Sequence, residues 1–308
     1  MCPQNHRTQQ ALGRRIGKVL EIWRYPVKSM GGQRLETARI GHSGLAGDRH
    51  WAVLDAQLTE IRSAKRWPEL LRYRARYSGD GCPGTDDYDA QVQHVTVTAP
   101  DGRELGSDQP HCDEQLSNWL GRAATLSRRR PAHERDHYRL ARARTEAISS
   151  AEMGLLEDET PPDYSAISPE VMGALADCVT PPGVYVDAFP LHLLSRNTLA
   201  WLHARSGLDT DVRRFRPNLL IEVDGAGDSA AEHGWPGARL GIGKTILRVD
   251  SLTVRCAMPG RSQPLHDLAE QRALVRALVD HCQRCLGLNI IVEQTGLIRT
   301  GDPIFRLD

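Results

Sequence analysis

The sequence of 308 residues has little lysine, no long apolar run and no net charge. Only four of its 39 Lys+Arg residues are lysines, and 39 Asp+Glu bring the formal net charge to +0. A balanced chain lacks the basic footprint of a nucleic-acid-binding protein. No segment approaches the about 20 apolar residues of a membrane helix, and no apolar stretch follows the N-terminus as in a secretion signal. We therefore predict a cytoplasmic protein with no nucleic-acid or membrane partner.

Seven cysteines are an odd number spread over a long chain, which argues against a secreted disulfide framework. Cys282 and Cys285 form a C-x-x-C pair, a spacing used by redox motifs and by zinc sites. Both uses need further features, a thioredoxin-like βαβ setting or a second pair of ligands, and the sequence shows neither. We interpret the pair as the end of a helix on which Cys282 packs inward.

The length predicts about two domains, and a 40% hydrophobic and 25% charged composition is that of a globular protein. Residues 1–16 are expected to be a flexible N-terminus. Short strands separated by turn signals, among them 79–81 and 100–102, dominate residues 17–125. Residues 126–184 are rich in charge and proline and are interpreted as a connector or insertion, and residues 185–308 form a second domain.

Hydrophobic periodicity predicts two main helices, over 190–204 and over 264–287, the latter with Gly287 at its C-cap. Shorter helices are expected over 115–120 and 168–176. Strands are expected over 17–27, 218–223, 239–242 and 246–256, followed by a hairpin over 288–307. Together these elements predict a β-rich α+β fold.

Basic clusters lie next to several predicted strands. Lys28 and Ser29 precede two glycines, and such a loop can hold a phosphate through backbone N–H groups and one positive charge; an ordinary solvated turn is the alternative. Arg49, in a Gly-Asp-Arg triplet, reads by itself as a turn with a surface ion pair. Arg214 and Arg216 flank an aromatic residue directly after Arg213. Like charges this close are costly unless carboxylates or an anion neutralise them, which favours an anionic ligand.

Cys256 follows Arg255 at the end of a predicted strand. A positive neighbour favours the thiolate, which is the form that acts as a nucleophile or as a ligand of a soft metal. A buried structural cysteine is the alternative interpretation. Cys256 is therefore our candidate catalytic residue and metal ligand.

Taken in order, the motifs of this chain resemble those of the two-domain MOSC family, which includes the amidoxime-reducing components. The motifs are Arg24–Met30, Gly47–Arg49, Arg214–Asn218, Arg255–Cys256 and Gly296–Asp302. The resemblance covers about residues 17–125 and 185–307. It implies a MOSC β-barrel-like domain with a smaller β-rich N-terminal domain, and a molybdenum–molybdopterin cofactor held in a cleft between them. Pyridoxal phosphate binding is associated with the family only, and we assign it no residue.

The resemblance also implies roles for individual residues. Cys256 matches the cysteine that ligates molybdenum, and Ser195 falls in a segment that contributes hydroxyl contacts. Basic and polar residues at motif positions are expected around the pterin and its phosphate: Lys28, Ser29, Arg49, Arg214, Arg216, Asn218 and Arg255. A thiolate suits a soft metal, and clustered arginines suit an anionic phosphate. The chain departs from the family pattern after Met258, where it continues with residues 259–263 in place of a threonine and a longer loop.

The activity that the resemblance implies is the reduction of N–O bonds in N-hydroxylated small molecules at the Cys256-ligated metal. Two alternatives are a sulfur-transfer protein that carries a persulfide on Cys256, and a module that binds or stores the cofactor. The cysteines do not show the C-x4-C-x2-C spacing of a plant-type [2Fe–2S] cluster, and we predict no dinucleotide-binding glycine motif. We therefore expect an external electron donor, of ferredoxin or cytochrome type and served by a reductase.

Overall fold

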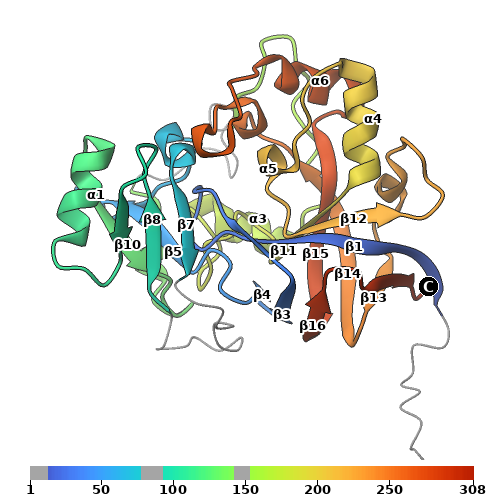
Figure 1. The fold of residues 1–308 in the computed structure, drawn as a ribbon, viewed down its shortest axis with the longest axis horizontal. Coiled ribbons are helices and arrows are strands. Elements are labelled where there is room, and N and C mark those ends of the chain that lie inside the picture. The colour runs from blue at the N-terminus through green and yellow to red at the C-terminus, as the bar shows by residue number, and fades with distance from the viewer. Residues whose placement is uncertain (1–12, 78–92, 142–152) are drawn as a thin grey trace, which may run out of the picture.

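The computed structural model describes residues 13–77, 93–141 and 153–308. Residues 1–12 of the expected flexible N-terminus, the turn at 79–81 and residues 142–152 of the connector lie outside these ranges. Most of the elements that it describes are short strands, and Figure 1 shows them in two groups, with the β-barrel on one side and a smaller β-rich part beside it.

Seven strands close into a barrel. Their order is β12-β11-β15-β14-β13-β17-β1, and the pairing of β12 with β1 joins the two ends. Only β11 and β12 run parallel to each other; the other neighbours in the barrel are antiparallel. Closure removes the exposed sheet edges, so that backbone groups are paired all round. The strands are β1 (Arg14–Arg24), β11 (Leu191–Ser195), β12 (Leu219–Val223), β13 (Arg239–Ile242), β14 (Thr245–Val254), β15 (Cys285–Gln294) and β17 (Pro303–Arg306), and β2 (Gln33–Leu35) extends the sheet beyond β1.

The barrel interior is filled by alternate residues of its strands. In β14, Thr245, Leu247 and Val249 are buried while the residues between them are less so, as expected for a strand with one face inward. Each fully buried leucine, isoleucine or valine contributes about 1.5–3 kcal/mol. Val19 and Ile22 of β1 belong to the same core cluster. The strand that the sequence analysis placed in the first domain therefore completes the barrel of the second.

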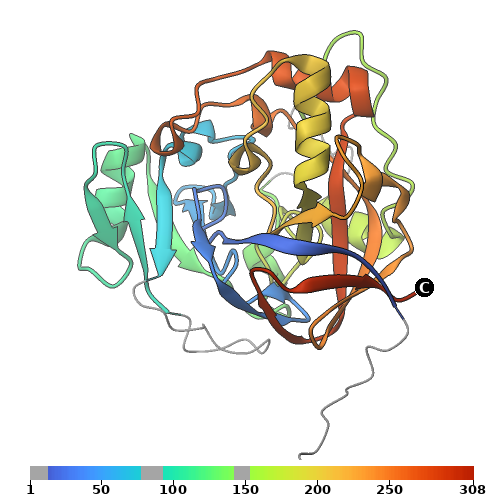
Figure 2. The ribbon, with the colours of Figure 1, turned by 45° about the vertical axis from the view of Figure 1, so that its right-hand side comes forward.

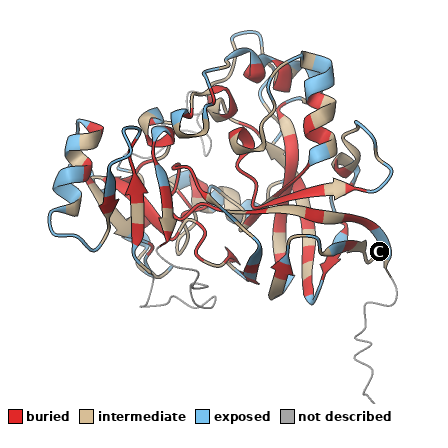
Figure 3. Cartoon of the chain, viewed as in Figure 1, coloured by how far each residue is buried: buried red, intermediate tan, exposed pale blue. Residues whose placement is uncertain are grey.

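The smaller part has a separate core. It contains two three-stranded sheets, β10-β5-β6 and β7-β8-β9, and Leu116 of α1 packs with Val53 and Val97 of these sheets. Figure 3 shows the strands mostly buried and the outer face of α1 exposed. The elements are β5 (Trp51–Asp55), β6 (Glu60–Ile61), η1 (Pro68–Arg72), β7 (Arg74–Tyr77), β8 (Val95–Thr98), β9 (Glu104–Gly106), α1 (Cys112–Leu120) and β10 (Ala124–Arg128). A further sheet, β16-β3-β4, joins β3 (Thr37–Gly41) and β4 (Gly44–Leu45) to β16 (Gly296–Arg299) near the C-terminus.

Helices cover one end of the barrel and the connector (Figures 1 and 2). α4 (Arg196–Ser206) and α6 (Ala273–Cys282) share a core cluster that includes Leu199, Leu202 and Leu278. The remaining elements are η2 (Arg135–Tyr138), α3 (Pro169–Asp177), α5 (Val212–Phe215), η3 (Ala231–Gly234), η4 (Met258–Gly260) and η5 (Pro264–His266). No helix within the described ranges has the length and apolar character needed to cross a membrane.

The predicted β-rich fold is confirmed, but both main helices were predicted wrongly in extent. Within 190–204, the first five residues form β11 and the helix begins only at Arg196, since a run of leucines in a buried strand resembles a helical stripe. Within 264–287, only Ala273–Cys282 is α-helical. The helix stops because Gln283 and Arg284 take left-handed backbone conformations, and Gly287 lies inside β15.

Candidate functional site

One cavity of about 220 Å³ brings together seven of the predicted site residues. They come from the loop after β1, the loop before β5, the loop between α5 and β12, and the end of β14. Loops from both parts of the chain therefore face one space. The seven residues are Lys28, Ser29, Arg49, Arg216, Asn218, Arg255 and Cys256.

Arg216 is the strongest indication of an anionic ligand. Its side chain is 4% exposed, and neither Nη1 nor Nη2 has a hydrogen-bond partner among the described residues. Its guanidinium carbon lies 4.2 Å from the ring centroid of Tyr25, and that of Arg49 lies 4.9 Å from the same centroid. Burial lowers the pKa of Arg216 to about 10, so the group stays charged at neutral pH. A buried charge without a partner is costly, and an anion in the cavity would supply the missing partner.

Three cavity residues hold unusual backbone conformations. Ser29, Arg49 and Arg216 have φ angles of 68°, 51° and 55°, in the left-handed region that residues other than glycine seldom adopt. Such conformations persist where the surroundings impose them, and they are frequent at functional sites. Here the Ser29 Oγ accepts a hydrogen bond from the Ala64 backbone N–H at 2.9 Å, and the Arg49 N–H donates to the Tyr25 carbonyl at 2.7 Å.

Lys28 is buried but already has an anionic partner. Its ammonium group donates to the Asp187 carboxylate and, at 2.9 Å, to the Tyr185 carbonyl, while the Lys65 Nζ lies 3.2 Å from Asp187. Burial lowers the pKa of Lys28. Burial would raise the pKa of Asp187, but Lys28 and Lys65 hold it well below its usual range. Lys28 therefore brings less uncompensated charge to the cavity than Arg216.

Arg255 and Asn218 hold the loops of the cavity in place. The Arg255 Nη2 donates to the Phe215 carbonyl at 2.7 Å, its Nη1 lies 3.4 Å from His192 Nε2, and its Nε has no partner among the described residues. The Asn218 side chain donates to the Trp23 carbonyl and accepts from the His192 N–H, both at 3.2 Å. Burial, with the charges of Arg255 and Arg49, keeps the pKa of His192 well below its usual range, so this imidazole is neutral.

The Cys256 thiol is free and half-buried, and it lies two residues beyond the end of β14. The next residue, Ala257, donates its backbone N–H to the Met153 carbonyl at 3.0 Å. In the part of the chain that the structure describes, no cluster of three or more His, Cys, Asp or Glu side chains is arranged to hold a metal ion. Cys256 thus offers one soft sulfur ligand at the wall of a basic cavity.

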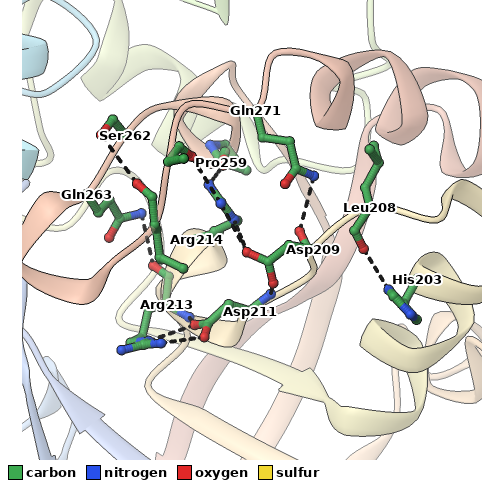
Figure 4. Close-up of polar contacts among 12 residues, drawn as sticks. His203, Leu208, Asp209, Asp211, Arg213, Arg214, Pro259, Ser262, Gln263 and Gln271 are labelled. Atoms are coloured by element: carbon green, nitrogen blue, oxygen red, sulfur yellow. Dashed lines mark hydrogen bonds and ion pairs between the residues drawn. The ribbon is translucent and has the colours of Figure 1, made fainter.

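The structure does not bring Ser195 and Arg214 into this cavity. Ser195 is fully buried at the start of α4, where its Oγ accepts from the Thr198 N–H at 2.9 Å and donates to Glu232 at 2.8 Å. It is a helix cap. Arg214 donates to the Asp209 carboxylate at 3.0 Å and to the carbonyls of Pro259 and Ala269 (Figure 4).

The three neighbouring arginines of the sequence therefore have separate roles. Arg213 pairs with Asp211, and Arg214 ties α5 to the loop that contains Pro259. Arg216, which follows α5 in a left-handed conformation, is the one that lines the cavity. Carboxylates already neutralise the first two charges, so the anionic ligand inferred from all three arginines rests on Arg216.

The C-x-x-C pair lies outside the cavity. Cys282 is the last residue of α6 and its thiol donates to the Leu278 carbonyl at 3.1 Å, while Cys285 begins β15. Burial raises the pKa of Cys282 to about 12 and also raises that of Cys285. Both thiols are free and protonated at neutral pH, as expected for cysteines at the end of a helix.

Sequence reasoning missed the wall of the cavity that the connector supplies. Apolar side chains from this segment line the cavity opposite the arginines, together with Asp187 and His192 from the entry to β11. None of them lies in a recognisable motif, and the only available signal was a few apolar residues within a charged, proline-rich stretch. The apolar residues are Met153, Tyr164, Ile167, Leu175, Val179 and Val186.

A closed barrel of this order, with a cysteine after one strand and a basic cavity against an N-terminal β-rich part, is the arrangement of a MOSC protein. The MOSC domain profile matches residues 182–305, and the MOSC N-terminal beta barrel domain profile matches residues 16–129. The chain belongs to the MOSC family and carries both domains.

Curated relatives cover nearly the whole chain at low identity. Mitochondrial amidoxime-reducing component 1 of Xenopus laevis is 26% identical over 316 residues, which span 95% of this chain and 82% of the relative. The Homo sapiens protein of the same name is 24% identical over 331 residues, 97% of this chain and 86% of the relative. Among solved structures, the YUAD protein from Bacillus subtilis has 12% identity and a TM-score of 0.43, and the alignment covers 96% of this chain and 98% of that one.

Proposed function

We propose that this protein binds a molybdenum–molybdopterin cofactor in the cavity and reduces N–O bonds of N-hydroxylated small molecules. The observation that carries the proposal is the shared cavity of the free Cys256 thiol and the buried Arg216 guanidinium, whose terminal nitrogens have no partner among the described residues. The name of the curated relatives, amidoxime-reducing component, supports the choice of reaction. We further propose a cytoplasmic location.

The residues present fit such a cofactor. Cys256 would bind the metal through its sulfur, and Arg216 with Arg49 would hold the anionic phosphate through charge-assisted hydrogen bonds. When bound, the molybdenum centre supplies the two-electron chemistry. The chain itself orients the cofactor: Tyr25 supports both guanidinium groups, and Arg255 is aligned by the Phe215 carbonyl.

Metal content tests the proposal against its alternatives. We expect about one molybdenum per chain, following from a single Cys256 ligand, when the protein is purified from a host that makes the cofactor. Labile sulfane sulfur on Cys256 without molybdenum would replace the proposal with a sulfur-transfer protein. Bound cofactor without turnover of any N-hydroxylated compound would replace it with a storage module.

The reaction needs electrons from outside the cavity. Breaking the N–O bond of an N-hydroxylated amine consumes two electrons and two protons, and the oxygen leaves as water. We expect turnover with a reduced viologen, none with NADH or NADPH alone, and nicotinamide-dependent turnover after addition of a reductase with a ferredoxin or a cytochrome. Sustained turnover of the purified chain with NADH alone, or an iron–sulfur absorbance band, would contradict the prediction.

A further inference from the structure

The cavity has two chemically different walls. One carries the arginines and comes from the loops after β1, before β5 and before β12. The other comes from the connector segment 153–186 and is apolar, with Met153, Tyr164, Ile167 and Leu175 among its side chains. Met153 and Leu175 are 5% and 7% exposed, so these side chains are packed into the protein.

A buried salt bridge holds the apolar wall to the barrel. The Arg284 side chain is 0% exposed and the Glu159 side chain 3%. The Arg284 Nη2 donates to Glu159 Oε2 at 2.7 Å and to the Gly154 carbonyl at 2.9 Å, and a second bond joins its Nε to the same carboxylate. Each charge has its partner, so the pair is fixed in one geometry.

The same guanidinium reaches the residue before Cys256. The Arg284 Nη1 donates to the Arg255 carbonyl at 3.1 Å, and the Arg284 carbonyl accepts from the Arg255 N–H at 2.8 Å. On the other side of Cys256, the Ala257 N–H donates to the Met153 carbonyl at 3.0 Å. The peptide groups on both sides of Cys256 are therefore bonded to Arg284 or to the connector, so the thiol and the apolar wall are held as one unit.

Tyr164 lies on this wall close to the thiol. Burial raises the pKa of Tyr164, and the charges of Cys256 and Glu159 raise it further, while Lys65 and Arg284 act in the opposite direction. These interactions place the phenol between the thiol and the Glu159–Arg284 salt bridge. A molecule that contacts Cys256 from this side meets an aromatic and aliphatic surface.

We propose that the connector, held by Glu159 and Arg284, is the wall that selects the substrate. The inference rests on the proposed function and names its substrate class: N-hydroxylated compounds whose N–O group is attached to an uncharged, apolar body. Such a body would lie on the connector, while the basic wall holds the anionic cofactor. Charged or hydroxyl-rich N-hydroxylated compounds, such as N-hydroxylated nucleosides, would gain nothing from this wall.

The first test changes the wall. We expect Ile167→Asp to lower kcat/KM for an arylamidoxime at least tenfold while leaving that for hydroxyurea within about twofold. The matched control is Leu58→Asp, the same change at an exposed leucine outside the cavity, which should alter neither value. Equal losses for both substrates in Ile167→Asp would overturn the proposal.

A second readout of the wall does not depend on turnover. In the cofactor-free protein, N-phenylmaleimide should alkylate Cys256 faster than N-(2-hydroxyethyl)maleimide, and Ile167→Asp should reduce this ratio at least threefold, measured on the Cys256 peptide by mass spectrometry. A reduced ratio without any N–O reduction would retain the apolar wall and reject the proposed function. An unchanged ratio would reject the wall itself.

The salt bridge supplies a matched pair of variants. Glu159→Gln removes the buried charge opposite Arg284, whereas Asp158→Asn removes the adjacent exposed charge that pairs with Arg276. We expect only Glu159→Gln to reduce the maleimide ratio at least threefold, at a temperature where both variants are folded by circular dichroism. If Glu159→Gln lowers the melting temperature and leaves the ratio unchanged, the pair is structural and does not position the wall.

Discussion

Replacing Cys256 with serine is expected to reduce the turnover of N-hydroxylated substrates to background and to lower the molybdenum content, while the protein remains folded. A hydroxyl is a harder donor than a thiol and ionises far less readily, so it is a poor ligand for a soft metal. The Cys256 thiol is half-buried and makes no hydrogen bond with the described residues, so the change from sulfur to oxygen breaks no structural contact. Viologen-linked activity, elemental analysis and thermal unfolding together measure these three effects.

Cys282→Ser and Cys285→Ser are the controls for this experiment. Cys282 donates to a carbonyl within α6, a bond that serine also makes, and neither residue lines the cavity. Both variants should keep their molybdenum and their activity. Full activity in Cys256→Ser, or loss of the metal in the two controls, would show that the metal site is elsewhere.

Arg216→Ala is expected to weaken cofactor binding by roughly 10- to 150-fold, because a charge-assisted hydrogen bond contributes about 1.5–3 kcal/mol. The same variant should not lower the stability of the cofactor-free protein, because the two terminal nitrogens that it removes have no hydrogen-bond partner among the described residues. Cofactor retained after gel filtration and thermal unfolding of the empty protein measure the two effects. Arg216→Lys should restore part of the binding through its charge.

Arg214→Ala is the contrasting variant, two residues away. It removes bonds to the Asp209 carboxylate and to two carbonyls, and should lower the free energy of unfolding by about 1–3 kcal/mol. Its cofactor affinity at a temperature where it is folded should stay close to that of the unchanged protein. The assignment fails if Arg214→Ala loses the cofactor while Arg216→Ala retains it.

The three arginines show why sequence reasoning reached the cavity without identifying all of its members. Their spacing predicted an anionic ligand, but it could not show which charges were already neutralised. Asp209 and Asp211 are close in sequence to Arg213 and Arg214, whereas the Pro259 carbonyl that Arg214 also contacts is 45 residues away. Ser195 is similar: its position after a leucine-rich stretch indicated a site hydroxyl, and the buried Glu232, 37 residues further on, makes it part of a helix cap.

The apolar wall was beyond the reach of sequence reasoning for the same physical reason. Met153, Tyr164 and Ile167 have no periodicity that distinguishes them from a surface insertion. Their position depends on Arg284, which the sequence presented only as the residue between two cysteines. A buried ion pair between residues 125 apart forms only when the chain is folded, so no local pattern announces it.

The sequence by itself determined the β-rich class, the family and the residues from which a cofactor site would be built, since these depend on composition, on alternation along strands and on short ordered motifs. The tertiary structure alone decided that β1 closes the barrel formed by the C-terminal strands, that Arg216 faces the cavity while Arg214 does not, and that the connector lies beside Cys256. The reason is that strand pairing and charge neutralisation between distant segments depend on which groups meet in three dimensions. Local propensity has the same value whichever partner a residue finally meets.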